Sequence, residues 1–132
     1  MRELWRNDKG FTAVIPSPLL LDGVLYVIKN GGILTSFDAA TGKLIKTGRV
    51  EGAISGYSSS PVAAEGRIYL AGEDGKVAVL RAGGQWEVIA VNDLGEPMFA
   101  TPALSEGQIY LRTGGALYRF GSAAAPPERE VP

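Results

Sequence analysis

Residues 17–27 read SPLLLDGVLYV, and the same pattern returns twice further along the chain. Residues 60–70 read SPVAAEGRIYL, and residues 101–111 read TPALSEGQIYL. From proline to proline the spacing is 43 and then 41 residues. A period of about 40–45 residues is typical of folds in which each repeat is one four-stranded propeller blade. The repeat therefore predicts an all-β chain built from consecutive blades.

Each repeat reads as short strands joined by tight glycine turns. A two-residue turn separates two apolar runs in all three repeats, at Asp22-Gly23, Glu65-Gly66 and Glu106-Gly107. Such dipeptides favour β-hairpin loops, because glycine readily adopts a positive φ. The run from Val24 to Ile28 is apolar at successive positions, which indicates that both faces of its sheet are covered. A blade packed between two neighbouring blades meets that condition.

Counting strands divides the chain into a propeller unit over residues 1–121 and a disordered tail over residues 122–132. The tail is rich in alanine, proline and glutamate, a composition typical of disorder. The unit is predicted to hold about three four-stranded antiparallel blades. Its parts are the outer strand of a preceding blade, two complete blades, and a blade that lacks its outer strand, at residues 3–6, 13–47, 57–91 and 98–120.

Three blades do not close a ring, because propellers typically have about 4–8. The chain is then either the C-terminal three-blade part of a larger propeller or half of a six-bladed ring formed by two copies. In the second case, the strand at residues 3–6 of one copy completes the blade at residues 98–120 of the other. We therefore expect a protein partner or self-association as a homodimer.

Composition excludes several kinds of chemistry within this chain. Its 132 residues include no cysteine and no histidine. Thiolate nucleophiles, disulfides, Cys/His zinc sites and Ser-His-Asp triads are therefore excluded. The 13 basic residues are scattered and the net charge is −1, so no nucleic-acid partner is expected. We therefore predict no catalytic, cofactor-binding or metal-binding residues. We also predict no membrane insertion and no signal peptide, because no apolar run is long enough for either.

One motif points to a known family. Residues 38–43 read DAATGK, and together with the repeated Ser-Pro segment they resemble the pyrroloquinoline-quinone-like (PQQ-like) propeller repeats over about residues 3–121. In that family a tryptophan shortly after the motif docks one blade against the next. Lys46 stands at that position in the first full repeat, whereas Trp5 fits it for the preceding blade. The second repeat has Arg81-Ala82-Gly83-Gly84 in place of the motif.

The resemblance implies a noncatalytic interaction or scaffold propeller. Quinone-dependent dehydrogenases of the family use a complete ring, a calcium ion, a catalytic aspartate and often a vicinal disulfide, and this chain has no cysteine. The noncatalytic branch includes outer-membrane assembly scaffolds, which implies a periplasmic or extracytoplasmic parent protein. Two alternatives stay open: a remnant of a quinone-dependent dehydrogenase, or a sensor domain of a larger receptor or kinase.

Aromatic residues supply the candidates for partner contact. Propellers recognise partners around their axis, and the loops that lead into the inner strands contain Phe11, Tyr57 and Phe99. We predict these three as partner-contact residues. The recurring tyrosines and the two tryptophans are instead predicted to pack between blades, because a repeat position usually serves the repeat: Tyr26, Tyr69, Tyr110, Trp5 and Trp86.

Overall fold

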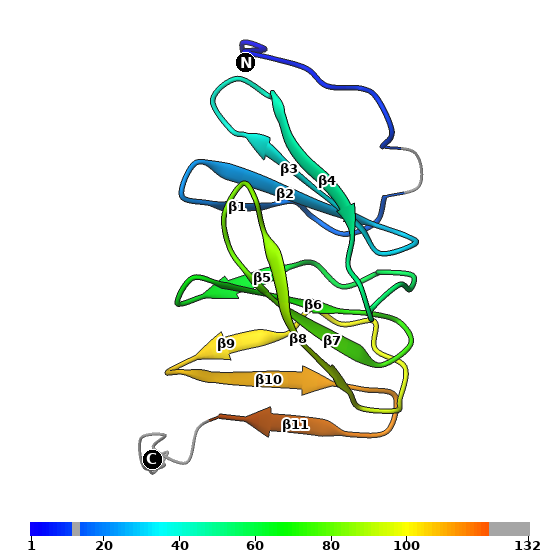
Figure 1. The fold of residues 1–132 in the computed structure, drawn as a ribbon. Helices are drawn as coiled ribbons and strands as arrows, with labels where there is room; N and C mark the ends of the chain where they lie inside the picture. Colours follow the sequence, from blue (N-terminus) through cyan, green and yellow to red (C-terminus); the bar gives the residue numbers. More distant parts are fainter. Residues whose placement is uncertain (12–13, 122–132) are drawn as a thin grey trace.

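The computed structural model describes residues 1–11 and 14–121. These residues form eleven strands in three antiparallel sheets, and no helix is found among them. Figure 1 shows the sheets stacked along the chain, with the first sheet next to the N-terminus and the third at the opposite end. The predicted all-β blade architecture is confirmed.

Each sheet contains strands that are consecutive in the sequence, and every pair of hydrogen-bonded strands joins neighbours along the chain. The first sheet has the order β1-β2-β3-β4: Leu19–Leu21, Val24–Lys29, Ile33–Asp38 and Leu44–Arg49. The second has the order β5-β6-β7-β8: Val62–Ala64, Arg67–Ala71, Lys76–Arg81 and Glu87–Asp93. The third has only β9, β10 and β11: Ala103–Ser105, Gln108–Arg112 and Leu117–Phe120.

The first hairpin of every sheet has the turn that the sequence predicts. Asp22, Glu65 and Glu106 have φ values of 48°, 52° and 50°, and the glycine that follows each is also in the left-handed region. Two successive residues with positive φ make the turn whose twist matches a two-residue hairpin. The three sheets therefore begin from the same local geometry, which makes positions in different blades directly comparable.

The outer strands deviate from regular pairing at one shared position. The β3–β4 register shifts between Ser36 and Phe37, and the β7–β8 register shifts between Val79 and Leu80. Since Tyr26 pairs with Ser36 and Tyr69 pairs with Val79, the two irregularities are equivalent. The outer strands β4 and β8 therefore also occupy equivalent positions in their blades.

The core lies between the sheets. The larger cluster joins the first two sheets and includes Tyr26, Leu34, Ile68, Leu80 and Trp86, all at most 3% exposed. A smaller cluster joins the second sheet to the third: Ala71, Val77, Met98 and Leu111. Strands covered on both faces explain the continuous apolar runs of the sequence.

Three details differ from the predicted division of the chain or lie outside what is described. Residues 3–6 are not in a strand, because no described strand lies beside them to supply the hydrogen bonds of a ladder. The outer strands β4 and β8 end at Arg49 and Asp93, two residues beyond the predicted blade ends. The predicted disordered tail at residues 122–132 lies outside the described residues.

Candidate interaction surfaces

A hydrogen-bond ladder joins the blades just before their inner strands. The Ser17 amide donates to Ser60 Oγ, and the Ser60 amide donates to Thr101 Oγ1, each at 2.9 Å. These three residues precede the proline of their repeat. Each blade thus offers an amide to the next blade and a hydroxyl to the one before.

The N-terminal segment lies against the first blade as a preceding blade would. Trp5 Nε1 donates to the carbonyl of Ala39 at 3.0 Å, and the indole covers Gly42. A Cβ at Gly42 would lie 2.5 Å from the Trp5 ring, so only glycine leaves room for this packing. Phe11 continues the cover, with its ring centroid 5.9 Å from that of Phe37.

In the junction between the first two blades, the aromatic ring belongs to the following blade instead of the preceding segment. Here the aromatic ring comes from the loop before β8, where Trp86 is 3% exposed. Lys46 on β4 donates from Nζ to the Trp86 carbonyl at 2.6 Å, and its ammonium lies 4.1 Å from the indole centroid. Trp86 Nε1 has no acceptor within the described residues. Lys46 therefore contacts the next blade at the position where the PQQ-like repeat motif has a tryptophan.

Two further hydrogen bonds complete this closed junction. The Gly83 amide donates to the Tyr26 hydroxyl at 2.7 Å, and Ser36 Oγ donates to the Gly84 carbonyl at 2.7 Å. Burial raises the pKa of Tyr26. The loop between β7 and β8 thus fills the gap between the first and second sheets.

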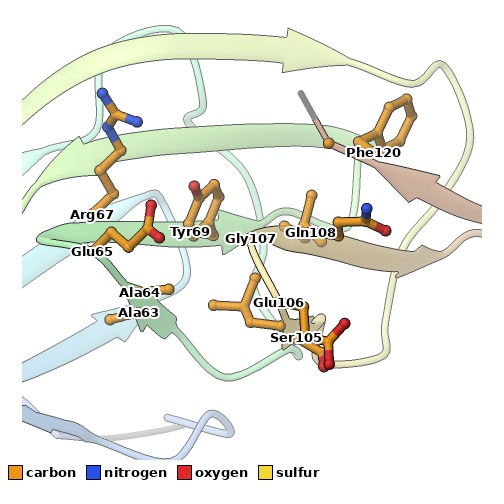
Figure 2. Close-up of a pocket in the computed structure, with 13 residues that line it drawn as sticks. Ala63, Ala64, Glu65, Arg67, Tyr69, Ser105, Glu106, Gly107, Gln108 and Phe120 are labelled. Carbon is orange, nitrogen blue, oxygen red and sulfur yellow. The ribbon is translucent and has the colours of Figure 1, made fainter. Parts of the chain in front are cut away.

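The corresponding gap between the second and third sheets is open. Figure 2 shows this groove, which has a volume of about 720 Å³ and includes Tyr69, Gln108, Phe120 and Gly121 in its lining. Tyr69 occupies the position of Tyr26, yet no described amide donates to its hydroxyl. The third blade therefore lacks the loop, as well as the outer strand, that closes the junction before it.

The connections between blades form a second surface, called here the loop face. They lead into the inner strands β1, β5 and β9 and lie along the right-hand side of the stack in Figure 1. Each carries one large apolar side chain exposed to solvent: Ile15, Ile54 and Phe99, at 69%, 48% and 61%. The loop face therefore presents one exposed apolar residue in each of its three connections.

Buried polar contacts hold these connections in place. The Tyr57 hydroxyl donates to the Ala53 carbonyl at 2.5 Å, and the Tyr57 amide donates to Asn30 Oδ1 at 2.9 Å. Burial raises the pKa of Tyr57. In the next connection, Glu96 accepts from Thr113 Oγ1 at 2.7 Å and from the Tyr118 hydroxyl at 3.1 Å, and this second bond raises the pKa of Tyr118. These bonds hold in place the connections that carry Ile54 and Phe99.

The three predicted contact residues have different environments. Tyr57 is 1% exposed and its ring packs in the core under the loop, so a contact of Tyr57 with a partner stays a prediction. Phe11 is half-buried against Phe37, and Phe99 is exposed; their contact roles stay predictions. Ile15 and Ile54 were missed, although their position in equivalent connections was a usable signal.

The acidic residues show no ligand constellation in the part of the chain that the structure describes. No three of them gather in an arrangement that would hold a metal ion. Asp38 instead accepts from the amides of Ala40 and Thr41 at 2.9 and 3.1 Å, which makes a local turn at residues 38–43. Residues 1–11 and 14–121 contain no helix with the length and hydrophobicity needed to cross a bilayer.

Comparison with known proteins gives one family. A family model described as outer membrane protein assembly factor BamB matches residues 2–87. The outer membrane protein assembly factor BamB of Shewanella oneidensis is 33% identical over 78 residues, which is 59% of this chain and 19% of that protein. The chain therefore spans about a fifth of the length of this curated relative.

Solved structures share the fold at low sequence identity. The crystal structure of BamB from Moraxella catarrhalis matches 83% of this chain and 34% of that protein, with a TM-score of 0.65 and 17% identity. A quinohemoprotein alcohol dehydrogenase from Pseudomonas putida matches 83% of this chain and 19% of its own, with a TM-score of 0.69 and 17% identity. Because the family model covers well over half of the sequence, the chain belongs to the PQQ-repeat family described as outer membrane protein assembly factor BamB.

Proposed function

We propose that the chain is a noncatalytic propeller module that binds another protein through its loop face. The observation that carries the proposal is the exposed apolar residue in each of three successive connections: Ile15, Ile54 and Phe99. Ile54 and Phe99 lie in connections that hydrogen bonds hold in place, so these segments lose little conformational freedom on binding, which favours a stable contact. Aromatic residues such as Phe99 are also enriched in protein interfaces.

Family membership suggests the kind of partner. Relatives of this chain are outer membrane protein assembly factors. We infer that this chain serves the same process as part of a scaffold, in an extracytoplasmic compartment. Its partner is then a protein of the outer membrane assembly machinery, and its role is to hold that protein in place.

The polar groups of the described residues support a structural role for them. Glu73 accepts from Ser58 Oγ at 2.5 Å, while Asp38 and Glu96 accept from neighbouring groups of the fold. Each of these carboxylates thus holds a turn or a connection in place. The sequence adds no histidine or cysteine that would supply the commonest bases and nucleophiles.

A photo-crosslinking amino acid placed at Phe99 or Ile54 tests the proposal inside the source bacterium. We expect crosslinks to a component of the outer membrane assembly machinery, identified by mass spectrometry. Leu44 is the matched control, because it is 51% exposed but begins β4, at the opposite end of the blade from the connections. Equal crosslinking from Leu44, or products unrelated to membrane protein assembly, would contradict the proposed role.

Titration distinguishes this role from a quinone-dependent one. The quinohemoprotein dehydrogenases share the fold, so the purified chain should be titrated with pyrroloquinoline quinone in the presence of Ca²⁺. We expect no saturable change in the fluorescence of Trp5 and Trp86. Saturable, stoichiometric binding would favour a remnant dehydrogenase site over a scaffold.

A further inference from the structure

The turn between β6 and β7, at residues 72–75, lies between the connections that lead into β5 and β9. On one side, the Glu73 amide donates to the Gly56 carbonyl in the first of these connections at 2.9 Å. On the other side, the amide of Leu94, where the second connection begins, donates to the Gly75 carbonyl at 2.9 Å. The turn therefore belongs to the loop face.

Exposed apolar side chains flank this turn. Ile54, two residues before Gly56, is 48% exposed, and Phe99 in the other connection is 61% exposed. The turn itself carries Glu73, which is half-buried. A partner that covers both apolar side chains therefore also removes water from the Glu73 carboxylate.

The Glu73 carboxylate has a defined position on this face. Its Oε1 accepts from Ser58 Oγ at 2.5 Å. Its Oε2 lies close to the backbone of Gly56, where a Cβ would be only 2.6 Å away. The carboxylate is thus oriented before any partner binds, which lowers the entropic cost of a contact with it.

Glu73 has no counterion in the part of the chain that the structure describes. Its Oε2 accepts no hydrogen bond there, and its side chain forms no ion pair. Other carboxylates of this face have local partners, since Glu96 accepts from two hydroxyl groups and Asp74 lies 3.9 Å from Lys76 Nζ. Glu73 thus places a charge without a counterion beside the exposed apolar residues.

We propose that Glu73 pairs with an arginine of the protein that binds the loop face, an inference that rests on the proposed function of this face. A carboxylate enclosed by an apolar contact loses its water, and a cation with well-placed hydrogen bonds offsets that cost. Arginine suits the position because its guanidinium is planar, weakly hydrated and rich in donors. Arginine is also enriched in interfaces and among the residues that dominate their energies.

A photo-crosslinking amino acid at Phe99 tests this pairing in the source bacterium. The full chain carries the crosslinker either alone or together with Glu73→Gln, which keeps the acceptor for Ser58 and removes the charge. We expect Glu73→Gln to lower the yield of the partner adduct about tenfold or more, because losing one member of a buried charge pair is costly. Glu73→Arg should abolish the adduct.

Gly56→Ala displaces the charge without removing it. Gly56 has no positive φ, so alanine does not strain the backbone, but its Cβ would push the Glu73 carboxylate away. The adduct yield should fall in this variant as well. Equal midpoints of urea unfolding for the purified variants and the unmodified chain show that the fold is intact.

Asp93→Asn is the matched control for the loss of a negative charge. Asp93 is exposed at the end of β8, next to the connection of Phe99, and asparagine keeps the acceptor for the Gly95 amide. Its adduct yield should equal that of the chain that carries the crosslinker alone.

An exchange of charges completes the test. Mass spectrometry of the adduct identifies the contacting segment of the partner, whose arginines are then replaced by glutamate one at a time. One replacement should abolish the adduct with Glu73 and restore it with Glu73→Arg. Yields that do not depend on Glu73, an equal loss in Asp93→Asn, or no restoring exchange would overturn the pairing but not the binding role of the loop face. The absence of any adduct without further substitutions would overturn the proposed function and the pairing together.

Discussion

At the residue scale, Gly42 determines where the N-terminal segment lies. Its φ is +75°, and a Cβ at this position would overlap the Trp5 ring at 2.5 Å. Gly23 has nearly the same φ, +77°, but a Cβ there would meet nothing within 4 Å. Replacing either glycine would therefore strain the backbone to a similar degree, and only a replacement of Gly42 would also collide with Trp5.

Gly42→Ala is expected to displace Trp5 from the first blade, while Gly23→Ala leaves it in place. Both variants should lose about 1–2 kcal/mol in the free energy of unfolding from the positive φ. Only Gly42→Ala should shift tryptophan emission towards the red, because the indole becomes exposed to water. Matching emission spectra from the two variants would show that Trp5 does not pack on Gly42.

Tyr57 makes the stability of the fold sensitive to alkaline pH. Burial raises its pKa above the value of 10.0 that applies in an unfolded chain. The neutral phenol therefore stabilises the fold fully below pH 10, and this contribution falls as the pH rises further, because the unfolded chain releases the proton more easily.

Tyr57→Phe is expected to lower the free energy of unfolding by about 1 kcal/mol at pH 7, through loss of the hydrogen bond to Ala53. Its stability should then decline less steeply above pH 10 than that of the unmodified chain. Denaturant titrations between pH 7 and 11 measure both effects. Parallel declines for the two proteins would contradict a buried, neutral Tyr57.

At the scale of single elements, β6 and β8 of the second sheet contrast a buried strand position with an exposed one. Ile68 on β6 is 0% exposed, whereas Ile89 on β8 of the same sheet is 40% exposed. Ile68→Ala should cost about 2–5 kcal/mol, the usual range for emptying a core site. Ile89→Ala should cost much less, because its side chain is already partly in water. Similar midpoints in a denaturant titration would contradict the packing of β6 between blades.

The strands could be predicted because their signals are local. Dipeptides such as Asp22-Gly23 specify the hairpin turn, and a 43-residue repeat of the same pattern fixes the blade period. The missing outer strand of the third blade was visible for the same reason. Strand ends were less certain, since β8 continues to Asp93 without a local stop signal at residue 91.

The junctions and connections could not be predicted because they depend on residues far apart in the sequence. Lys46 and Trp86 are 40 residues apart, and nothing near either of them shows that the aromatic ring now comes from the following blade. Tyr57 is buried because Asn30, 27 residues earlier, binds its amide and orients the loop. From sequence alone, an aromatic residue in a polar loop is equally consistent with a contact to a partner and with a place in the core.

At the scale of the whole molecule, each described blade packs against its neighbours in sequence. The N-terminal segment packs on the first blade through Trp5, and the third sheet has three described strands. In repeat folds, stability comes largely from the interfaces between neighbouring repeats. The two junctions between the described sheets are therefore expected to hold the stack together.

Amide hydrogen exchange on the unmodified chain tests the blade account most directly. β2 and β6 lie inside their sheets and carry buried side chains, whereas β8 is an outer strand with mostly exposed side chains. We predict that β2 and β6 exchange most slowly and that β8 exchanges faster. Rapid exchange of β6 beside a protected β8 would contradict the packing of the second sheet between its neighbours.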